Sequence, residues 1–174
     1  MKKRLLLEQE RIQKRVRELA EEINTSYGDE KLIIVPILRG GFMFSADLIR
    51  HLRMPVEIDF LTTSSYGNAT VTSGDVQIYS DVRSNLKGNH VLVVDDIIDS
   101  GKTIAHVKDH ILSKEPKSLK FCTLLDKPSR RRVEISSDFV GFTIDDLFIV
   151  GYGLDYQGLY RNIPYIFVFE EDKE

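Results

Sequence analysis

The chain has 174 residues, of which 42% are hydrophobic and 29% are charged, the balance of an ordinary soluble protein with one substantial core. Its formal net charge of −3 argues against nucleic acid or an anionic membrane as the main partner, because both require a basic face. No stretch could span a bilayer, and the apolar run after the basic start ends at Glu8, too early for a signal peptide.

These features predict a single domain over residues 1–174 and a cytoplasmic location. The lone cysteine, Cys122, has no partner for an internal disulfide and lies inside an apolar run, which predicts a buried thiol in a reducing compartment.

The first predicted element is an amphipathic helix. Ile12, Val16, Leu19 and Ile23 recur at helical spacing between charged residues. Gly28 follows as a candidate left-handed stop. We expect this helix to pack against the core and to take no part in chemistry.

A buried strand is predicted at 32–38, where Pro36 suits a strand end or an edge better than a centre. The next triplet, Arg39-Gly40-Gly41, taken alone, is a tight turn into a helix over 42–52. A third strand is predicted at 56–62. Residues 63–75 are small and polar, and so long a loop in a compact domain is usually functional or disordered.

The central feature is the segment 91–103, which reads Val-Leu-Val-Val-Asp-Asp-Ile-Ile-Asp-Ser-Gly-Lys-Thr. The apolar run predicts a strand covered on both faces, as in a parallel sheet. Asp95 and Asp96 stand where that strand should end, the edge at which open α/β sheets bind ligands. Five residues then form a loop with exposed backbone N–H groups at a helix start, an anion site: Asp99, Ser100, Gly101, Lys102 and Thr103.

Three carboxylates beside an anion loop predict a ribose-phosphate site. The loop N–H groups can bind a phosphate, while the acids bind ribose hydroxyls or Mg²⁺. A nucleotide P-loop is excluded, because its first glycine would fall at Asp96. The remaining alternative is a strand, loop and helix whose acids serve as cap and surface charge, which explains one acid better than three.

The segment resembles the phosphoribosyl-pyrophosphate (PRPP) motif of the type I phosphoribosyltransferases, and the likeness to the hypoxanthine-guanine phosphoribosyltransferases extends in order along nearly the whole chain. It implies an α/β fold whose central, mostly parallel sheet is flanked by helices, with a small hood from the N-terminal and C-terminal segments. The alternation of strands and helices from 32 to 125 independently supports α/β. The implied reaction is purine salvage with Mg²⁺, in which PRPP and hypoxanthine or guanine give IMP or GMP and pyrophosphate.

The resemblance also implies roles for the central acids. Asp95 and Asp96 would contact the ribose hydroxyls and a metal ion, residues 100–103 would hold the 5′-phosphate, and Asp99 would accept a proton from the purine N7 as general base. The family usually has Glu-Asp at the acid pair. We expect ribose binding to survive the shorter side chain of Asp95.

By the same resemblance, Arg39, Gly40 and Arg161 would bind pyrophosphate, with a cis peptide bond between Arg39 and Gly40. The loop at about 64–75 would be a mobile lid that excludes water and carries the pair Ser65 and Tyr66. A flexible hairpin tip is the simpler interpretation of that loop, since 76–79 resumes as a strand.

The purine would be bound by residues that follow a strand at 119–125. The ammonium of Lys127 is a donor only, so it favours a 6-oxo group over the 6-amino group of adenine. Phe148 would stack on the base, the backbone at Ile149 would read its edge, and Asp155 would help to hold a second Mg²⁺ through water.

The three arginines at 130–132 are typical of a solvated charged face, and 163–169 predicts a final strand. The competing functions are a PRPP-sensing regulator, which should carry a DNA-binding module or a basic face, and a phosphoribosyltransferase for adenine or xanthine. Lys127 argues against adenine. Family members are commonly dimers or tetramers, so we expect a homodimer or homotetramer.

Overall fold

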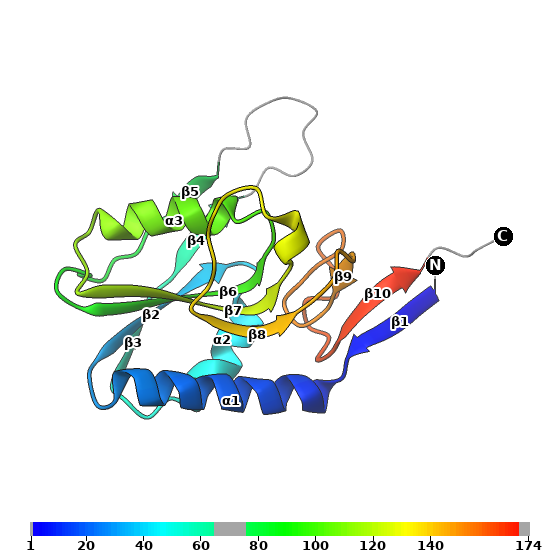
Figure 1. The fold of residues 1–174 in the computed structure, drawn as a ribbon, viewed down its shortest axis with the longest axis horizontal. Coiled ribbons are helices and arrows are strands. Elements are labelled where there is room, and N and C mark those ends of the chain that lie inside the picture. The colour runs from blue at the N-terminus through cyan, green and yellow to red at the C-terminus, as the bar shows by residue number, and fades with distance from the viewer. Residues whose placement is uncertain (1, 65–75, 171–174) are drawn as a thin grey trace.

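The computed structural model describes residues 2–64 and 76–170 (Figure 1). In this part of the chain, a seven-stranded sheet has the order β5-β4-β2-β6-β7-β8, with β3 also paired to β2. Only the β4–β5 pair is antiparallel. The strands are β2 (Leu32–Leu38), β3 (Val56–Ile58), β4 (Leu61–Ser64), β5 (Gln77–Ser80), β6 (His90–Ile98), β7 (Ser118–Asp126) and β8 (Phe139–Thr143).

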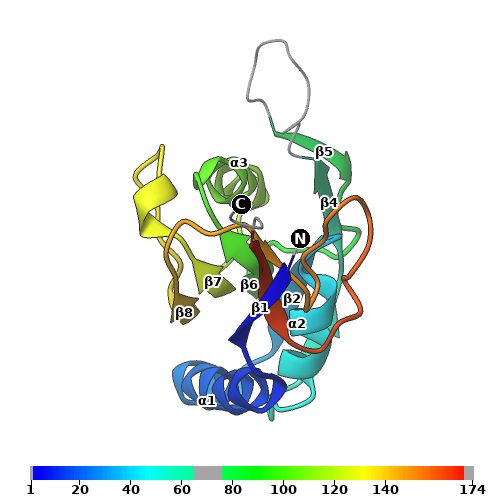
Figure 2. The ribbon, with the colours of Figure 1, turned by 90° about the vertical axis from the view of Figure 1, so that its right-hand side faces the viewer.

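Helices cover both faces of this sheet, as the sequence predicts (Figures 1 and 2). The helices α1 (Gln9–Tyr27) and α2 (Phe42–Ile49) lie on one face, and α3 (Lys102–Leu112) lies on the other. Alternate residues of β6 pack into the two separate cores: Leu92 and Val94 face α1 and α2, while Val91 and Val93 face α3. The α/β fold with a mostly parallel central sheet is therefore confirmed.

The two terminal segments form a second, three-stranded sheet in the described residues, with the order β1-β10-β9. Its strands are β1 (Lys2–Leu7), β9 (Ile149–Val150) and β10 (Ile166–Glu170). The sequence did not predict β1, because the strand is exposed along most of its length and only Leu7 is buried.

The strand β6 extends further than predicted, and this shapes the site. Its pairing with β2 ends at Val94, whereas its pairing with β7 continues to Ile98. Asp95 and Asp96 therefore lie inside the strand, but beyond the last residue paired to β2. At the two acids β6 is no longer paired to β2, and the turn that follows β2 lies beside them.

Two further predictions about the strands were wrong. Pro36 does not lie at an edge: it pairs with Val94 in the middle of the sheet. On its other side the pairing with β3 ends at Ile34 and that with β4 begins at Ile37, so the proline lies opposite a break. The same break divides the single strand predicted at 56–62 into β3 and β4.

The helix predicted at 42–52 ends earlier, at Ile49, and the strand predicted at 163–169 begins at Ile166. Other features agree with the sequence. The backbone at Gly28, where α1 ends, has a positive φ of 59°. Cys122 is a buried free cysteine, and burial raises the pKa of its thiol. Among the described helices, none is both long and apolar enough to cross a membrane.

Candidate active site

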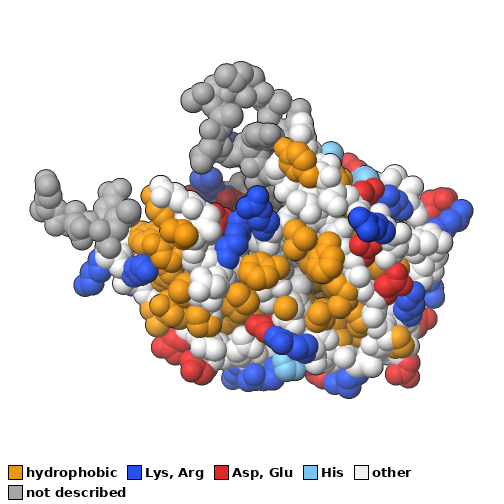
Figure 3. All heavy atoms as spheres, turned by 180° about the vertical axis from the view of Figure 1, so that it is seen from behind, with side chains coloured by type: hydrophobic (Ala, Val, Ile, Leu, Met, Phe, Trp, Pro, Cys, Tyr) orange, Lys and Arg blue, Asp and Glu red, His pale blue; other side chains and the backbone are white. Residues whose placement is uncertain are grey.

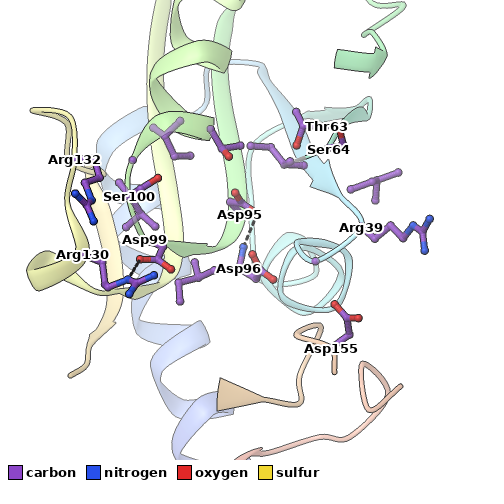
Figure 4. Close-up of a pocket in the computed structure, with 18 of the residues that line it drawn as sticks. Arg39, Thr63, Ser64, Asp95, Asp96, Asp99, Ser100, Arg130, Arg132 and Asp155 are labelled. Carbon is purple, nitrogen blue, oxygen red and sulfur yellow. Dashed lines mark hydrogen bonds and ion pairs between the residues drawn. The ribbon is translucent and has the colours of Figure 1, made fainter. Parts of the chain in front are cut away.

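A cavity of about 690 Å³ opens at the carboxyl ends of β2 and β6 (Figure 4). Ten of the residues that the sequence singled out line it together: Arg39, Gly40, Asp95, Asp96, Asp99, Ser100, Gly101, Thr103, Asp155 and Arg161. They come from three parts of the chain. The parallel sheet brings the first two parts together, since the carboxyl ends of β2 and β6 meet at one edge. The third part, with Asp155 and Arg161, is the loop between β9 and β10 of the second sheet.

The acid pair is buried at the floor of this cavity. Asp95 and Asp96 are only 7% and 8% exposed, and both line the cavity. The carboxylate of Asp95 accepts a hydrogen bond from the backbone N–H of Asp96 at 2.9 Å. Burial raises the pKa of both carboxyl groups, and the charge of Asp96 raises that of Asp95 further. A ligand that offers hydroxyls or a cation would relieve this cost.

The phosphate loop runs from Asp99 to the start of α3. Gly101 has a left-handed backbone with φ of 84°, and its carbonyl accepts the N–H of Ala105 at 2.9 Å. The first N–H groups of an α-helix have no partner inside the helix, so they can bind an anion. The side chain of Lys102 is exposed and does not line the cavity, so at this position the loop offers its backbone.

The segment 130–135, which begins with three arginines, packs over this loop. The sequence did not predict this contact. The N–H of Arg132 donates to the carbonyl of Ser100 at 2.8 Å. A side chain on Gly101 would collide with Ile135 at 2.6 Å and crowd Val133 at 3.0 Å, and the positive φ of Gly101 also favours glycine. The segment is thereby fixed beside the phosphate loop.

The interpretation of residues 130–132 as a solvated face was wrong for Arg131 and incomplete for the other two. Arg131 donates to the carbonyl of Asp99 at 2.7 Å and to the carboxylate of Asp126 at 2.5 Å. Arg130 and Arg132 line the cavity, and Arg130 donates to the Asp99 carboxylate at 3.2 Å. The 3₁₀ helix η1 (Pro128–Arg130) turns this segment back toward β6. Its proline was the feature of the sequence that could have indicated the turn.

The glycine turn after β2 lies against the acid pair. A side chain on Gly40 would overlap the carboxylate of Asp96, and one on Gly41 would come within 3.0 Å of the carbonyls of Ile37 and Val94. The cis peptide bond joins Leu38 to Arg39, one residue before the bond predicted between Arg39 and Gly40. The family resemblance therefore indicated the correct turn and the wrong bond.

A loop from Gly151 to Arg161 closes the other side of the cavity. Arg161 donates to the carbonyl of Gly153 at 2.6 Å and forms an ion pair with Asp155 at 2.8 Å. A side chain on Gly153 would collide with the carbonyl of Gly40, so the two loops are in close contact. The charge of Arg161 acts to lower the pKa of Asp96, which indicates that these side chains lie near each other.

Of the residues predicted for the purine, Asp155 lines the cavity, whereas Lys127, Phe148 and Ile149 are not among its lining residues. Lys127 is 7% exposed, and its ammonium donates to the carbonyl of Leu147 at 2.5 Å. Phe148 follows directly and is 59% exposed, with its ring edge-on to Tyr156 at 5.7 Å. Ile149 is buried in β9. The structure thus brings Lys127, Phe148 and Ile149 together. Ser65 and Tyr66 lie outside the described residues.

The cavity wall suits a magnesium ion that arrives with a phosphorylated ligand. Mg²⁺ usually takes one or two carboxylates and completes its shell with waters and substrate phosphates. Asp95, Asp96 and Asp155 offer such oxygens to the cavity. Among the described residues, no three His, Cys, Asp or Glu side chains form a group that could hold a metal ion unaided. The cavity carboxylates fit Mg²⁺ that is also bound by ligand phosphates and waters.

Comparison with known proteins adds an independent line of evidence. The phosphoribosyl transferase domain family matches residues 5–157. The hypoxanthine phosphoribosyltransferase of Haemophilus influenzae is 48% identical over 165 residues, covering 93% of this chain and 92% of the relative. The hypoxanthine-guanine phosphoribosyltransferase of Bacillus subtilis is 46% identical over 167 residues, covering 96% and 93%.

The solved structures agree. A crystal structure of a hypoxanthine-guanine phosphoribosyltransferase from Bacillus anthracis, with a HEPES molecule in its active site, superposes with a TM-score of 0.91. Its sequence is 48% identical, and the match covers 96% of this chain and 98% of that one.

Proposed function

The chain belongs to the phosphoribosyltransferase family, and we propose that it transfers the 5-phosphoribosyl group of PRPP to hypoxanthine, guanine or both, as in purine salvage. The products would be IMP or GMP and pyrophosphate. The observation that carries the proposal is the single cavity shared by the acid pair, the phosphate loop and two arginines, Arg39 and Arg161.

In this proposal the phosphate loop fixes PRPP at one end. Backbone N–H groups at the start of α3 and the hydroxyls of Ser100 and Thr103 bind the 5′-phosphate. Asp95 and Asp96 bind the ribose hydroxyls, which supply the donors that two buried carboxylates require. The sugar is then held between the floor of the cavity and the incoming base.

The leaving group lies at the other end. Arg39 and Arg161 neutralise pyrophosphate, and Gly40 lets the backbone approach it closely. Asp95 and Asp96 would contact one Mg²⁺, and Asp155 would help to hold a second through water. These ions would neutralise the leaving pyrophosphate further. As the bond to pyrophosphate breaks, the ribose gains positive charge, and the carboxylates of the acid pair stabilise it.

The purine lies between Phe148 and the ribose. Phe148 presents an exposed aromatic face for stacking, the backbone of Ile149 reads the base edge, and Lys127 donates to the 6-oxo group. Asp99 accepts the proton that the purine N7 loses as the new bond forms. Adenine offers Lys127 an amino group where an acceptor is needed, which disfavours the alternative of an adenine enzyme.

The proposal includes a homodimer or homotetramer in the cytoplasm. Apolar side chains gather in patches on the face seen in Figure 3, and Leu5, Phe42 and Leu159 are among the exposed large hydrophobic residues. Such patches commonly mark contacts between subunits. Sedimentation velocity of the purified protein tests the assembly, and a monomer at micromolar concentration would contradict it.

Initial rates with PRPP and Mg²⁺ against hypoxanthine, guanine, xanthine and adenine test the function. We expect turnover of hypoxanthine or guanine and none of adenine. The same experiment shows whether xanthine is also a substrate. If none of the four purines is turned over while PRPP still binds in calorimetry, the assignment as an enzyme is wrong and a PRPP-sensing regulator is favoured.

A further inference from the structure

Four charged side chains form a row that joins the two ends of the site. The Asp99 carboxylate lies 3.2 Å from Nε of Arg130, and another nitrogen of Arg130 lies 3.5 Å from Asp146. The second oxygen of Asp146 lies 4.0 Å from the ammonium of Lys127. The row therefore runs from the residue proposed to take the N7 proton to the residue proposed to hold the 6-oxo group.

The signs alternate along the row, so its charges cancel. Arg130 and Asp146 occupy the middle, where their side chains are 53% and 50% exposed. An exposed ion pair of this kind contributes little to stability by itself. The arrangement is thus better explained by the positions that it gives to the two terminal residues than by folding.

The ammonium of Lys127 depends on this row. Its side chain is only 9% exposed, and a buried cation requires hydrogen-bond acceptors or a counter-charge. The Leu147 carbonyl takes one of its three donors. Asp146 is its ion-pair partner among the described residues. Asp146 and Leu147 are consecutive, so one short segment supplies both the counter-charge and the hydrogen-bond acceptor of Lys127.

We propose that Asp146 is a positioning residue that orients Lys127 toward the purine and, through Arg130, controls how tightly Asp99 is held. The inference rests on the proposed function and deepens it. A 6-oxo group competes with Asp146 for Lys127. Asp146 then attracts Arg130 more strongly, and Arg130 holds Asp99 less tightly. Binding of the correct base thereby frees the carboxylate that accepts its proton.

The variant Asp146→Asn tests this with steady-state kinetics, because it removes the charge and keeps the shape. We expect the KM for hypoxanthine or guanine to rise and kcat to fall, so that kcat/KM drops by roughly two- to fivefold, while the KM for PRPP stays within about twofold. Asp146→Glu keeps the charge and should recover most of the loss. The matched control is Asp145→Asn, since the exposed side chain of Asp145 has no partner among the described residues.

A double-mutant cycle tests the link through Arg130. If Arg130 carries the effect, Asp146→Asn combined with Arg130→Gln should cost less than the product of the two single losses. The thermal unfolding temperature of each variant is measured alongside the kinetics. A merely structural role would lower this temperature without changing the KM for the purine.

The outcomes separate the two proposals. If the wild-type protein is active and Asp146→Asn matches it, or if Asp145→Asn shows the same loss, the inference about Asp146 is wrong and the function stands. A variant that raises the KM for PRPP as much as that for the purine also refutes it. A wild-type protein that turns over no purine overturns the function and this inference together.

Discussion

Gly40 lies so close to Asp96 that a single methyl group on the glycine would overlap the carboxylate of the acid. Gly40 lies in the turn after β2, Asp96 lies in the neighbouring strand β6, and both residues line the cavity. The glycine is needed here for the space that it leaves and not for a positive φ.

Gly40→Ala should therefore displace Asp96 and weaken PRPP binding. We expect the KM for PRPP to rise by about tenfold or more, the effect of losing about 1.4 kcal/mol of binding, and steady-state kinetics measure it. The control is Gly88→Ala, where φ is 70° and no atom lies within 4 Å of the new methyl group. That variant should lose stability and keep its KM. An unchanged KM in Gly40→Ala would show that Asp96 does not need its present position.

Asp99→Asn should slow turnover by about a hundredfold or more, the usual contribution of a general base. The amide keeps the size of the side chain and loses the ability to accept a proton. PRPP binding, measured by calorimetry, should change by less than about threefold, because the loop N–H groups remain in place. Turnover within a few-fold of the wild-type rate would rule out proton acceptance by Asp99.

The sequence predicted the part of the site that is contiguous in the chain. Asp95, Asp96 and the phosphate loop follow one apolar strand, so a local pattern was enough to identify the edge and its chemistry. The length of β6 was underestimated for a related reason. Its last residues are held by pairing with β7, and polar side chains within a strand conceal that pairing in the sequence.

Contacts between distant segments could not be predicted in this way. Arg130 meets Asp99 across 31 positions, and a run of arginines carries no sign of which carboxylate each will find. The strand β1 was missed because it pairs with β10 at the other end of the chain and buries only Leu7. The resemblance to a family supplied the role of Lys127, which its position after a strand alone would not reveal.

Removal of metal should abolish activity. The cavity offers buried carboxylates and arginines, and pyrophosphate is too highly charged for the two arginines alone to balance it. We expect excess EDTA to lower the rate by about a hundredfold or more, with full recovery when Mg²⁺ is restored. Rates measured across a titration of free Mg²⁺ test this. Activity that persists in EDTA would show that the arginines and backbone suffice.

Asp47 should make stability depend on pH, because it connects the loop that carries Asp155 to the helices. It accepts hydrogen bonds from Tyr152, from Gln13 at 2.9 Å and from Arg50 at 2.5 Å. Burial acts to raise the pKa of Asp47, but these bonds outweigh it and lower the pKa below its ordinary value. The carboxylate therefore stabilises the folded state above pH of about 4, and the effect is lost as pH falls through the lowered pKa.

Asp47→Asn should reduce the free energy of unfolding at pH 7 by about 1–3 kcal/mol, the usual cost of weakening a partly buried hydrogen-bonded group. The difference from the wild type should shrink as pH falls below about 4, because the wild-type carboxyl then also becomes neutral. Urea unfolding followed by circular dichroism at several pH values measures both quantities, with Asp145→Asn as the matched loss of one exposed charge. A difference that stays constant down to pH of about 3 would show that the charge of Asp47 is not what stabilises this contact.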